Sequence, residues 1–391
     1  MMSSSETVFL VLGAVSLLAI LSNYVFYPIA IAILARLFPR SWKIDDEFQP
    51  AVTMILAAYN EEAVIREKLR NFLSLDYPAD RLFLLVGSDG STDATNAILE
   101  EFADGERIRY FQFPRGGKPK TINSLFRHVT TPIAVLTDTN VMYRRDAVKR
   151  LVRHFVDPTV GGVCGYQRTT PIGDSIAGES EHRYWEFENA LKRWEGTYAT
   201  TLGAAGGMYA IRTELYQPQP EIGTVADDLL LPLRIVAHGS RIVYDETALS
   251  EEETSPNLKA EFRRKVRIAI ATFNTIPQIL ALFKMLPLKV RVMLVFHKFL
   301  RWFVPLFMLV FLVSALALSS LRWIQLSVFV PLGVFGLFVV AGWIADRFEQ
   351  RLGAFSMPYY FFTSNLALLV ALLKLPFQKK TTGAWERSVR T

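Results

Sequence analysis

The stretch RLFLLVGSDGSTD, residues 81–93, decides the fold class of this chain. Its opening apolar run predicts a buried strand over residues 81–87. Asp89-Gly90 is a turn signal, and Ser91 or Thr92 can cap a following helix. Asp89 therefore stands at the end of a strand, where open α/β sheets bind their ligands. A free carboxylate there can accept a hydrogen bond from a ribose hydroxyl or a base N–H.

The same alternation of strand and helix continues on both sides of this stretch. We predict strands over 51–58, 108–113, 132–136 and 241–244, and helices over 61–73, 92–102, 119–128, 174–194 and 225–237. Elements of this length in alternation are typical of parallel βαβ units. The expected fold is thus an α/β domain with a mostly parallel sheet over residues 49–274.

Apolar segments flank this domain. Residues 7–35 are uncharged and are followed by Arg36, which predicts an N-terminal transmembrane helix rather than a cleaved signal peptide. Three uncharged segments on the C-terminal side, residues 302–321, 323–345 and 353–373, are each long enough to span a bilayer. The chain is therefore expected to be a multi-pass protein of the inner membrane.

Basic segments adjoin the apolar ones. Residues 276–301 are broken by prolines and are expected to form an interfacial amphipathic segment, and residues 376–391 form a basic tail. Four spans would place this tail on the opposite face from the α/β domain, although its charge favours the cytoplasmic face. Either the last apolar segment is re-entrant or the charge rule fails here.

The overall composition excludes several classes of protein. The chain has 391 residues, is 51% hydrophobic and carries a net charge of +6. Ten of its basic residues lie between Lys259 and Arg301, beside an apolar span, and not with a base-reading motif. We therefore expect a lipid bilayer as a partner and no nucleic acid. Cys164 is the single cysteine, so neither a disulfide framework nor a cysteine-based zinc site is expected.

Two short motifs place polar groups beside the predicted sheet. Tyr59-Asn60-Glu61 closes the first strand and exposes its side chains at the ligand-binding edge, although Asn60 can equally be a helix cap. Arg115-Gly-Gly-Lys118 precedes a helix, where glycines and a lysine can hold a phosphate. The spacing of a phosphate-binding Walker A loop is absent, so this second motif is weak by itself.

Three clusters of charge complete the candidate site. Asp138 and Asn140 follow a strand and can hold Mg²⁺ or Mn²⁺ against a diphosphate, unless they form only an Asx turn. Asp227-Asp228 opens an apolar helix, either as favourable first-turn acids or with one of them as a general base. Arg264 and Arg267 share a helix face, and their forks suit phosphate oxygens or a membrane surface.

The ordered motifs YNEE, SDGSTD, TDTN, GAAGGMYAIR, ADD and RRKVR resemble those of membrane-bound family-2 inverting glycosyltransferases. This family contains cellulose, hyaluronan and poly-N-acetylglucosamine synthases and many bacterial exopolysaccharide glycosyltransferases. The resemblance covers residues 51–272 and is specific as an ordered set, although no single motif is. It implies a Rossmann-like GT-A catalytic domain that binds a nucleotide sugar, usually a UDP-sugar, with Mg²⁺ or Mn²⁺ as cofactor.

The resemblance also implies a role for each motif residue. On the nucleotide, it implies Tyr59 and Glu61 near the uracil, Asp89 on the base or ribose, Lys118 on the nucleotide, and Arg264 and Arg267 on the pyrophosphate. It implies that Asp138 with Asn140 holds the metal and that Asp228 is the catalytic base. The residues that it implies near the acceptor are Gly206, Gly207, Met208 and Asp227. Two positions depart from the family pattern. Asn140 replaces the second acid of the metal-binding motif, and Ile268 replaces a tryptophan that follows the arginines in processive synthases.

The first departure implies that metal binding rests on Asp138 and the diphosphate. The missing tryptophan, together with only three C-terminal apolar segments, favours single-sugar transfer from a UDP-sugar to a lipid-linked or glycan acceptor at the cytosolic membrane face. A processive synthase that secretes its polymer is the alternative enzyme. A membrane transporter or scaffold with a regulatory α/β domain is the alternative of another class, but the uncharged spans offer it a poor substrate pathway. The oligomeric state, the donor sugar and the linkage stay open at this point.

Overall fold

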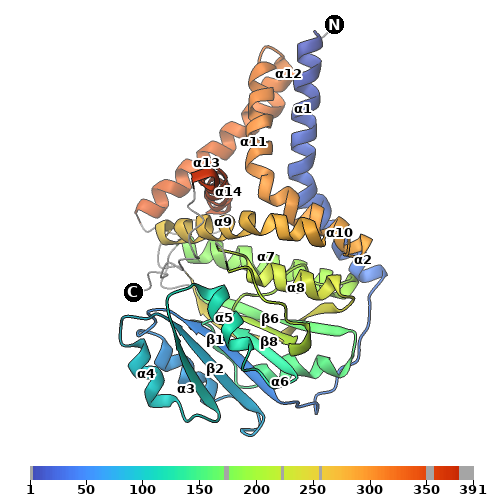
Figure 1. The fold of residues 1–391 in the computed structure, drawn as a ribbon. Helices are drawn as coiled ribbons and strands as arrows, with labels where there is room; N and C mark the ends of the chain where they lie inside the picture. Colours follow the sequence, from blue (N-terminus) through green and yellow to red (C-terminus); the bar gives the residue numbers. More distant parts are fainter. Residues whose placement is uncertain (1–2, 171–175, 222–223, 255–257, 349–355, 378–391) are drawn as a thin grey trace.

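The computed structural model describes residues 3–170, 176–221, 224–254, 258–348 and 356–377. An α/β domain lies beneath a group of apolar helices in Figure 1. Between the two lie helices α7 (Ile176–Tyr198), α8 (Asp227–Ala237) and α9 (Leu258–Leu282). The α/β fold predicted from the strand and helix pattern is confirmed. The apolar helices predicted before and after the domain in the sequence are confirmed as well.

The domain is built on one eight-stranded mixed sheet in the order β3-β2-β1-β4-β7-β6-β8-β5. Its strands are β1 (Val52–Ala58), β2 (Leu82–Asp89), β3 (Ile108–Phe113), β4 (Ile133–Thr137), β5 (Met142–Tyr143), β6 (Val160–Thr170), β7 (Met208–Arg212) and β8 (Arg241–Glu253). The first four in sheet order are parallel to one another, and β7 runs antiparallel to both β4 and β6. Strands β6 and β8 are again parallel.

Alternation along the central strands divides the core between the two faces of the sheet. In β4, Ala134 and Leu136 face the core on the membrane side, whereas Ile133 and Val135 face the opposite core. Both faces are buried, which explains why the strands read as continuous apolar runs. The helices of the domain are α3 (Ile65–Leu73), α4 (Thr95–Phe102), α5 (Lys118–Phe126), α6 (Ala147–Val152), α7 (Ile176–Tyr198), α8 (Asp227–Ala237) and α9 (Leu258–Leu282).

Sequence pattern alone missed part of the sheet. Strand β6 begins Val160-Gly161-Gly162, and glycines weaken a strand signal because they offer no side chain to pack. A Cβ on Gly162 would approach the Ile242 side chain and the Ala210 carbonyl of the neighbouring strands, so close backbone packing explains this glycine. Strand β8 runs well past its predicted end at residue 244, because its partly exposed, acidic second half still pairs with β6.

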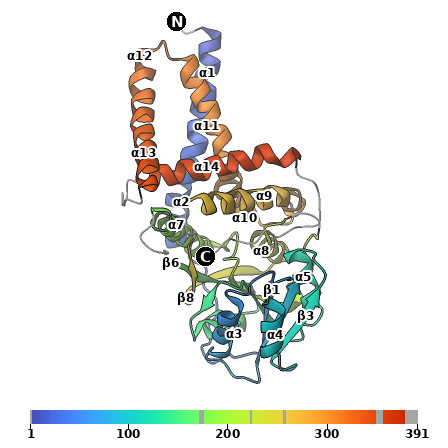
Figure 2. The same ribbon diagram turned by 90° about the vertical axis from the view of Figure 1, so that its left-hand side faces the viewer.

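Four helical stretches are long and apolar enough to cross a membrane, by length and composition. They comprise α1 (Ser4–Leu21) with α2 (Tyr27–Leu37), α10 (Leu288–Met293) with α11 (Leu300–Ala317), α12 (Arg322–Ile324) with α13 (Val330–Arg347), and α14 (Met357–Lys374). Short π-helical segments join the parts at Ser22–Phe26, Leu294–Phe299 and Gln325–Phe329, and 3-10 turns occur at Arg153–Val156, Thr213–Leu215 and Leu375–Phe377. Helices α1 and α11 lie side by side, with the N-terminus at the end far from the α/β domain (Figures 1 and 2).

Helix α14 does not stand upright beside the others. Figure 2 shows it lying crosswise to α11 and α13, directly above α9, which it contacts. Because α14 lies crosswise beside α9, it stays at the end of the apolar helices that is nearer to the α/β domain (Figure 2). A crosswise α14 is what the re-entrant alternative predicts. The face on which the basic tail lies stays a prediction, since residues 378–391 lie outside the described part of the chain.

The segment predicted to be interfacial, residues 276–301, is divided between two helices. Helix α9 continues through Pro277 to Leu282, and a short turn then leads into α10 and the long helix that contains α11. Helix α9 itself runs crosswise beneath the ends of the apolar helices that are nearer to the α/β domain (Figure 1). The arginines of the sequence motif therefore lie on a crosswise helix between the sheet and the apolar helices.

Candidate active site

A cavity of about 300 Å³ opens at the carboxyl end of β4, beside the N-termini of α5 and α8. This size suits a small-molecule ligand. The residues that line it include the predicted site residues Glu61, Lys118, Asp138, Asn140, Gly206, Gly207, Asp227, Asp228, Arg264 and Arg267. Asp89, Tyr59 and Met208 are not among them.

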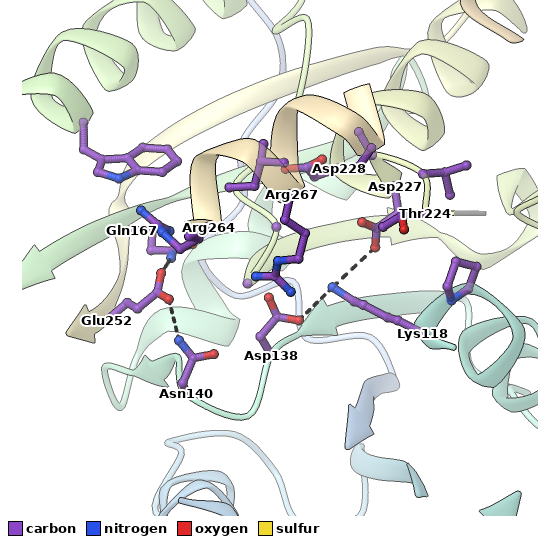
Figure 3. A pocket seen from close by; sticks show the side chains of 18 of the residues that line it. Lys118, Asp138, Asn140, Gln167, Thr224, Asp227, Asp228, Glu252, Arg264 and Arg267 are labelled. Atoms are coloured by element: carbon purple, nitrogen blue, oxygen red, sulfur yellow. Dashed lines mark hydrogen bonds and ion pairs between the residues drawn. The ribbon is translucent and has the colours of Figure 1, made fainter. Parts of the chain in front are cut away.

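Lys118 connects two carboxylates across this cavity. Its Nζ donates a hydrogen bond to Asp138 Oδ1 at 2.8 Å and lies 3.5 Å from Asp227 Oδ2 (Figure 3). Asp138 follows β4, and Lys118 and Asp227 begin α5 and α8, so the sheet edge and two helix N-termini meet here. The Asp227 carboxylate faces Lys118, and the predicted place of Asp227 near the acceptor stays a prediction.

Asp228 is the second residue of α8 and faces the same cavity. Burial raises the pKa of Asp228 to about 6, and the adjacent Asp227 adds to this shift while Lys118 opposes it. No donor of the described residues forms a hydrogen bond with the Asp228 carboxylate. A Cβ on Gly206 would lie 3.5 Å from Asp228 Oδ2, so the glycine leaves the space beside this carboxylate open. Asp228 therefore has the raised pKa and open surroundings of a general base.

The two motif arginines of α9, Arg264 and Arg267, have different surroundings. Arg264 Nε donates to Glu261 at 2.8 Å and Arg264 Nη2 to Glu181, so its charge is already neutralised. Arg267 lies one turn further along α9 and extends toward Asp138 and Lys118 (Figure 3). Both arginines line the cavity, and Arg267 is the one directed at its centre.

Sequence reasoning missed Glu252 and Gln167, which complete one wall of the cavity. Glu252 of β8 accepts hydrogen bonds from the amides of both Asn140 and Gln167 (Figure 3). Asn140 stands where a second acid was expected, and an acid there would face Glu252 with like charge. No local signal marks Glu252, because it lies in the part of β8 that the pattern did not predict.

Asp89 lies outside the cavity and binds the loop that precedes Lys118. Its side chain is 0% exposed, and its Oδ1 accepts hydrogen bonds from the backbone N–H groups of Gly116 and Gly117 at 2.7 and 3.0 Å. Arg115 pairs with the other carboxylate oxygen and stacks its guanidinium 3.4 Å from the centre of the Tyr59 ring. Asp89 thus holds the loop that leads into Lys118, and its predicted contact with base or ribose stays a prediction.

The first two motifs also bind each other. Asn60 adopts a left-handed backbone with φ 53°, and its Oδ1 accepts the Thr92 N–H at 2.8 Å. Glu61 N–H donates to Thr95 Oγ1 at 2.8 Å. Asn60 is therefore no helix cap for α3, which begins only at Ile65, but a link between two loops at the sheet edge.

The glycines before β7 and the methionine after them have separate roles. Gly206 and Gly207 line the cavity, whereas Met208 is completely buried within β7. A Cβ on Gly207 would overlap Val141 Cγ2, so only glycine lets this loop pack against the loop that carries Asp138. The acceptor contact predicted for Met208 has no counterpart among the cavity-lining residues.

Lys68 is a further residue that sequence reasoning missed. It lies on α3, is 1% exposed, and donates from Nζ to Thr137 Oγ1 at 2.7 Å and to the Val141 carbonyl. Burial lowers the pKa of Lys68 to about 7, and the Asp138 carboxylate opposes this shift. Lys68 therefore clamps both ends of the Asp138 loop. Its position in a helical pattern looks like that of any surface lysine, so no sequence signal marks it.

The oxygen donors of the cavity fit a hard divalent cation. Asp138 and Glu252 supply carboxylates and Asn140 an amide oxygen, the donor types that Mg²⁺ and Mn²⁺ prefer. Within the described ranges, no group of three or more His, Cys, Asp or Glu residues gathers as a metal cage. A cation here would therefore take most of its ligands from phosphate and water oxygens, as Mg²⁺ commonly does.

The profile of "Glycosyltransferase like family 2" matches residues 50–271, which is more than half of the chain. The chain belongs to this glycosyltransferase family. As a family-2 glycosyltransferase, it is 27% identical over 202 residues to the β-monoglucosyldiacylglycerol synthase of Synechocystis sp., covering 48% of this chain and 41% of that one. It is also 27% identical over 282 residues to "Probable glycosyltransferase YdaM" of Bacillus subtilis, covering 68% and 66%. A poly-β-1,6-N-acetyl-D-glucosamine synthase of Staphylococcus aureus is 21% identical over 231 residues, covering 57% and 55%.

The aligned part of this family-2 glycosyltransferase thus spans between 41% and 66% of the length of these curated relatives. Among solved structures, it is similar to the mannosyltransferase PcManGT from Pyrobaculum calidifontis in complex with GDP-Man and Mn²⁺. The TM-score is 0.70 at 21% identity, over 94% of this chain and 99% of that one. At this identity the likeness establishes the GT-A fold, which confirms the expectation drawn from the sequence motifs.

Proposed function

We propose that this protein transfers one sugar from a nucleotide sugar to a hydroxyl of a membrane-embedded acceptor, with inversion at the anomeric carbon. The observation that carries the proposal is a single cavity that joins Asp228 to the cluster of Lys118, Asp138 and Arg267. Asp228 can accept a proton, and Lys118, Asp138 and Arg267 can together hold a charged leaving group. Family membership and the GT-A fold support the same chemistry.

The cationic side of the cavity would hold the diphosphate. Lys118 and Arg267 face the space above Asp138, and the N-termini of α5 and α8 add partial positive charge. Asp138, with Asn140 and Glu252 nearby, would hold Mg²⁺ or Mn²⁺, which supplies further positive charge against the departing phosphates. Because these groups neutralise charge that develops on the leaving group, they lower the barrier for cleavage of the glycosidic bond.

Asp228 would serve as the general base. Its carboxylate takes the proton of the acceptor hydroxyl as the hydroxyl oxygen bonds to the anomeric carbon. The bond from that carbon to the diphosphate oxygen breaks on the opposite side, so the configuration inverts. The transition state resembles an oxocarbenium ion, as it does in glycoside hydrolysis.

A UDP-sugar is the proposed donor, as the motif resemblance implies. The archaeal neighbour is in complex with GDP-Man, so GDP-sugars belong in any donor screen. Ile268 is 47% exposed and lines the cavity where processive relatives have a tryptophan, which supports single transfer. The basic residues of α9 and α10 favour the cytosolic face of the inner membrane for the α/β domain.

A direct test uses the full chain purified in detergent. Isothermal titration calorimetry with UDP and GDP, each with and without Mn²⁺, should show metal-dependent nucleotide binding. A screen of nucleotide sugars with membrane lipid extract as acceptor should then show nucleotide release, and NMR of the product should show an inverted anomeric centre. If neither UDP nor GDP binds, the proposal is overturned. A product with retained configuration would overturn the proposed mechanism.

A further inference from the structure

Lys118 contacts the carboxylate oxygens that a divalent cation in the cavity would use. Its Nζ donates to Asp138 Oδ1 at 2.8 Å and lies 3.5 Å from Asp227 Oδ2, so one ammonium faces two carboxylates. All three side chains are at most 28% exposed, and water screens the charges of such partly buried groups weakly. Carboxylates are the ligands that Mg²⁺ and Mn²⁺ prefer. The ammonium and a divalent cation therefore compete for the same oxygens.

Asp227 Oδ2 shows that the contacts of these carboxylates are incomplete. The oxygen is buried, and among the described residues no donor forms a hydrogen bond with it. Lys118 Nζ is close enough to attract it but stays 3.5 Å away. A buried oxygen of this kind is commonly completed by water or an ion. Asp227 is thus a second acid, beside Asp138, that draws a cation into this part of the cavity.

The charges around Asp138 decide whether a divalent cation can enter. Asn140 stands where a second acid was expected, so Asp138 is the one carboxylate of its motif. Arg267 extends toward Asp138 and Lys118 (Figure 3). A cation that approaches Asp138 meets both of these positive groups, and it must displace Lys118 from Oδ1. Like charges a few ångströms apart repel one another strongly where water screens them weakly, so Lys118 opposes the entry of the metal.

A nucleotide diphosphate changes this balance. Its oxygens accept hydrogen bonds from an ammonium, and they also ligate Mg²⁺ or Mn²⁺. Lys118 opens α5, whose N-terminus favours a phosphate at the same place. The flexible four-carbon stem of lysine lets the ammonium move from a carboxylate to a phosphate. A diphosphate can therefore withdraw Lys118 from Asp138 and supply further metal ligands at the same time.

We propose that Lys118 stands in for the divalent cation while no nucleotide is bound, so that the metal and the nucleotide bind as a pair. The inference rests on the proposed function, because it concerns how the nucleotide site is filled. It keeps the affinity for the metal low without a nucleotide and raises it with one. Linkage then requires the metal to raise the affinity for the nucleotide by the same factor.

The test measures Mn²⁺ binding to the full chain in detergent without any nucleotide, from the EPR signal of unbound Mn²⁺. Lys118→Met removes the ammonium, and Lys118→Gln keeps a hydrogen-bond donor without the charge. We expect both variants to bind Mn²⁺ at least about tenfold more tightly than the parent. Lys120→Met, at an exposed lysine of the same helix, is the matched control and should bind Mn²⁺ as the parent does. Unchanged or weaker Mn²⁺ binding in both Lys118 variants would overturn the inference.

Two further variants show where the tighter binding arises and whether charge causes it. Lys118→Met combined with Asp138→Ala should lose the gain, because the carboxylate that Lys118 opposes is gone. A gain that survives in this double variant belongs to another part of the protein and contradicts the inference. Lys118→Arg keeps the positive charge and should bind Mn²⁺ as weakly as the parent. Tight binding in Lys118→Arg would show that the loss of charge is not the cause, which also overturns the inference.

Nucleotide binding separates this inference from the proposed function. In the parent, UDP or GDP should lower the Kd of Mn²⁺ at least about tenfold, and this effect should be much smaller in Lys118→Met. The nucleotide itself should bind Lys118→Met more weakly, whereas a merely distorted site would weaken metal and nucleotide binding together. An equally large nucleotide effect in Lys118→Met would overturn the inference. If the parent binds neither UDP nor GDP, the proposed function fails, while the nucleotide-free Mn²⁺ titration still decides whether Lys118 excludes the metal.

Discussion

Lys118 Nζ lies 2.8 Å from Asp138 Oδ1 and 3.5 Å from Asp227 Oδ2, so one cation holds the loop after β4 and the start of α8 together. The three side chains come from positions far apart in the chain and meet only at the sheet edge. This link orders the proposed nucleotide side of the cavity before any ligand arrives.

Asp138→Ala should remove the metal dependence of nucleotide binding. Asp138 is the carboxylate best placed for a divalent cation, and the aliphatic residue offers no oxygen ligand. In calorimetry, UDP should then bind equally with and without Mn²⁺. Asp80→Ala, at an exposed acid with only a 4.0 Å ion pair, is the control and should keep the metal effect. Persistent Mn²⁺ dependence in Asp138→Ala would show that the metal binds elsewhere.

Asp228→Asn should lower turnover by about 10²–10⁴-fold, the usual contribution of a positioned general base. The amide keeps the shape of the side chain but cannot take a proton. UDP binding should stay within about twofold of the parent, since Lys118, Asp138 and Arg267 are unchanged. Rates of nucleotide release measured under saturating donor check this, and turnover close to that of the parent would refute the base assignment.

Turnover should fall as the pH drops below about 6. The pKa of Asp228 is raised to about 6, and only its ionised form, which prevails above that pH, can accept a proton. Lys118 opposes the raised pKa, so Lys118→Met should move the acid limb of kcat/KM to higher pH. Lys120→Met, at an exposed lysine of the same helix, should leave the limb in place. A limb that does not move in Lys118→Met would contradict this electrostatic account.

Lys68→Met should destabilise the domain by about 1–3 kcal/mol, because the Thr137 hydroxyl and the Val141 carbonyl lose a buried donor. It should also raise the Mn²⁺ concentration needed for half-maximal activity, since the Asp138 loop is no longer clamped. Denaturant unfolding and a metal titration measure the two effects. Lys149→Met, which removes a surface ion pair with Asp76, should cost about 1 kcal/mol or less. A Lys68→Met protein with the metal response of the parent would show that the clamp is structural only.

Gly207→Ala should reduce activity because its Cβ would overlap Val141 Cγ2 and push the two loops apart. Val141→Ala removes the obstructing methyl groups, so the double variant should recover part of the activity lost in Gly207→Ala. A double-mutant cycle on kcat/KM measures the coupling. Additive effects of the two substitutions would contradict the steric explanation.

The sequence predicted the site residues that belong to local patterns and missed those that depend on distant contacts. Asp138, Asp227 and Asp228 follow or open regular elements, so their approach to one sheet edge could be foreseen. Glu252 and Lys68 carry no local signal, because their hydrogen-bond partners lie far from them in the sequence. Asp89 was placed at the correct strand end, but only the structure shows that a loop already occupies its carboxylate.

The sequence by itself determined the α/β domain, the apolar flanks and the order of the motifs, because hydrophobic periodicity and turn chemistry act over a few neighbouring residues. The tertiary structure alone decided which charges neutralise one another. It pairs Arg264 with Glu261 and Glu181 and directs Arg267 into the cavity. It also lays α14 across the upright helices. Electrostatic pairing and helix packing depend on distances between remote segments, and those distances exist only once the chain has folded.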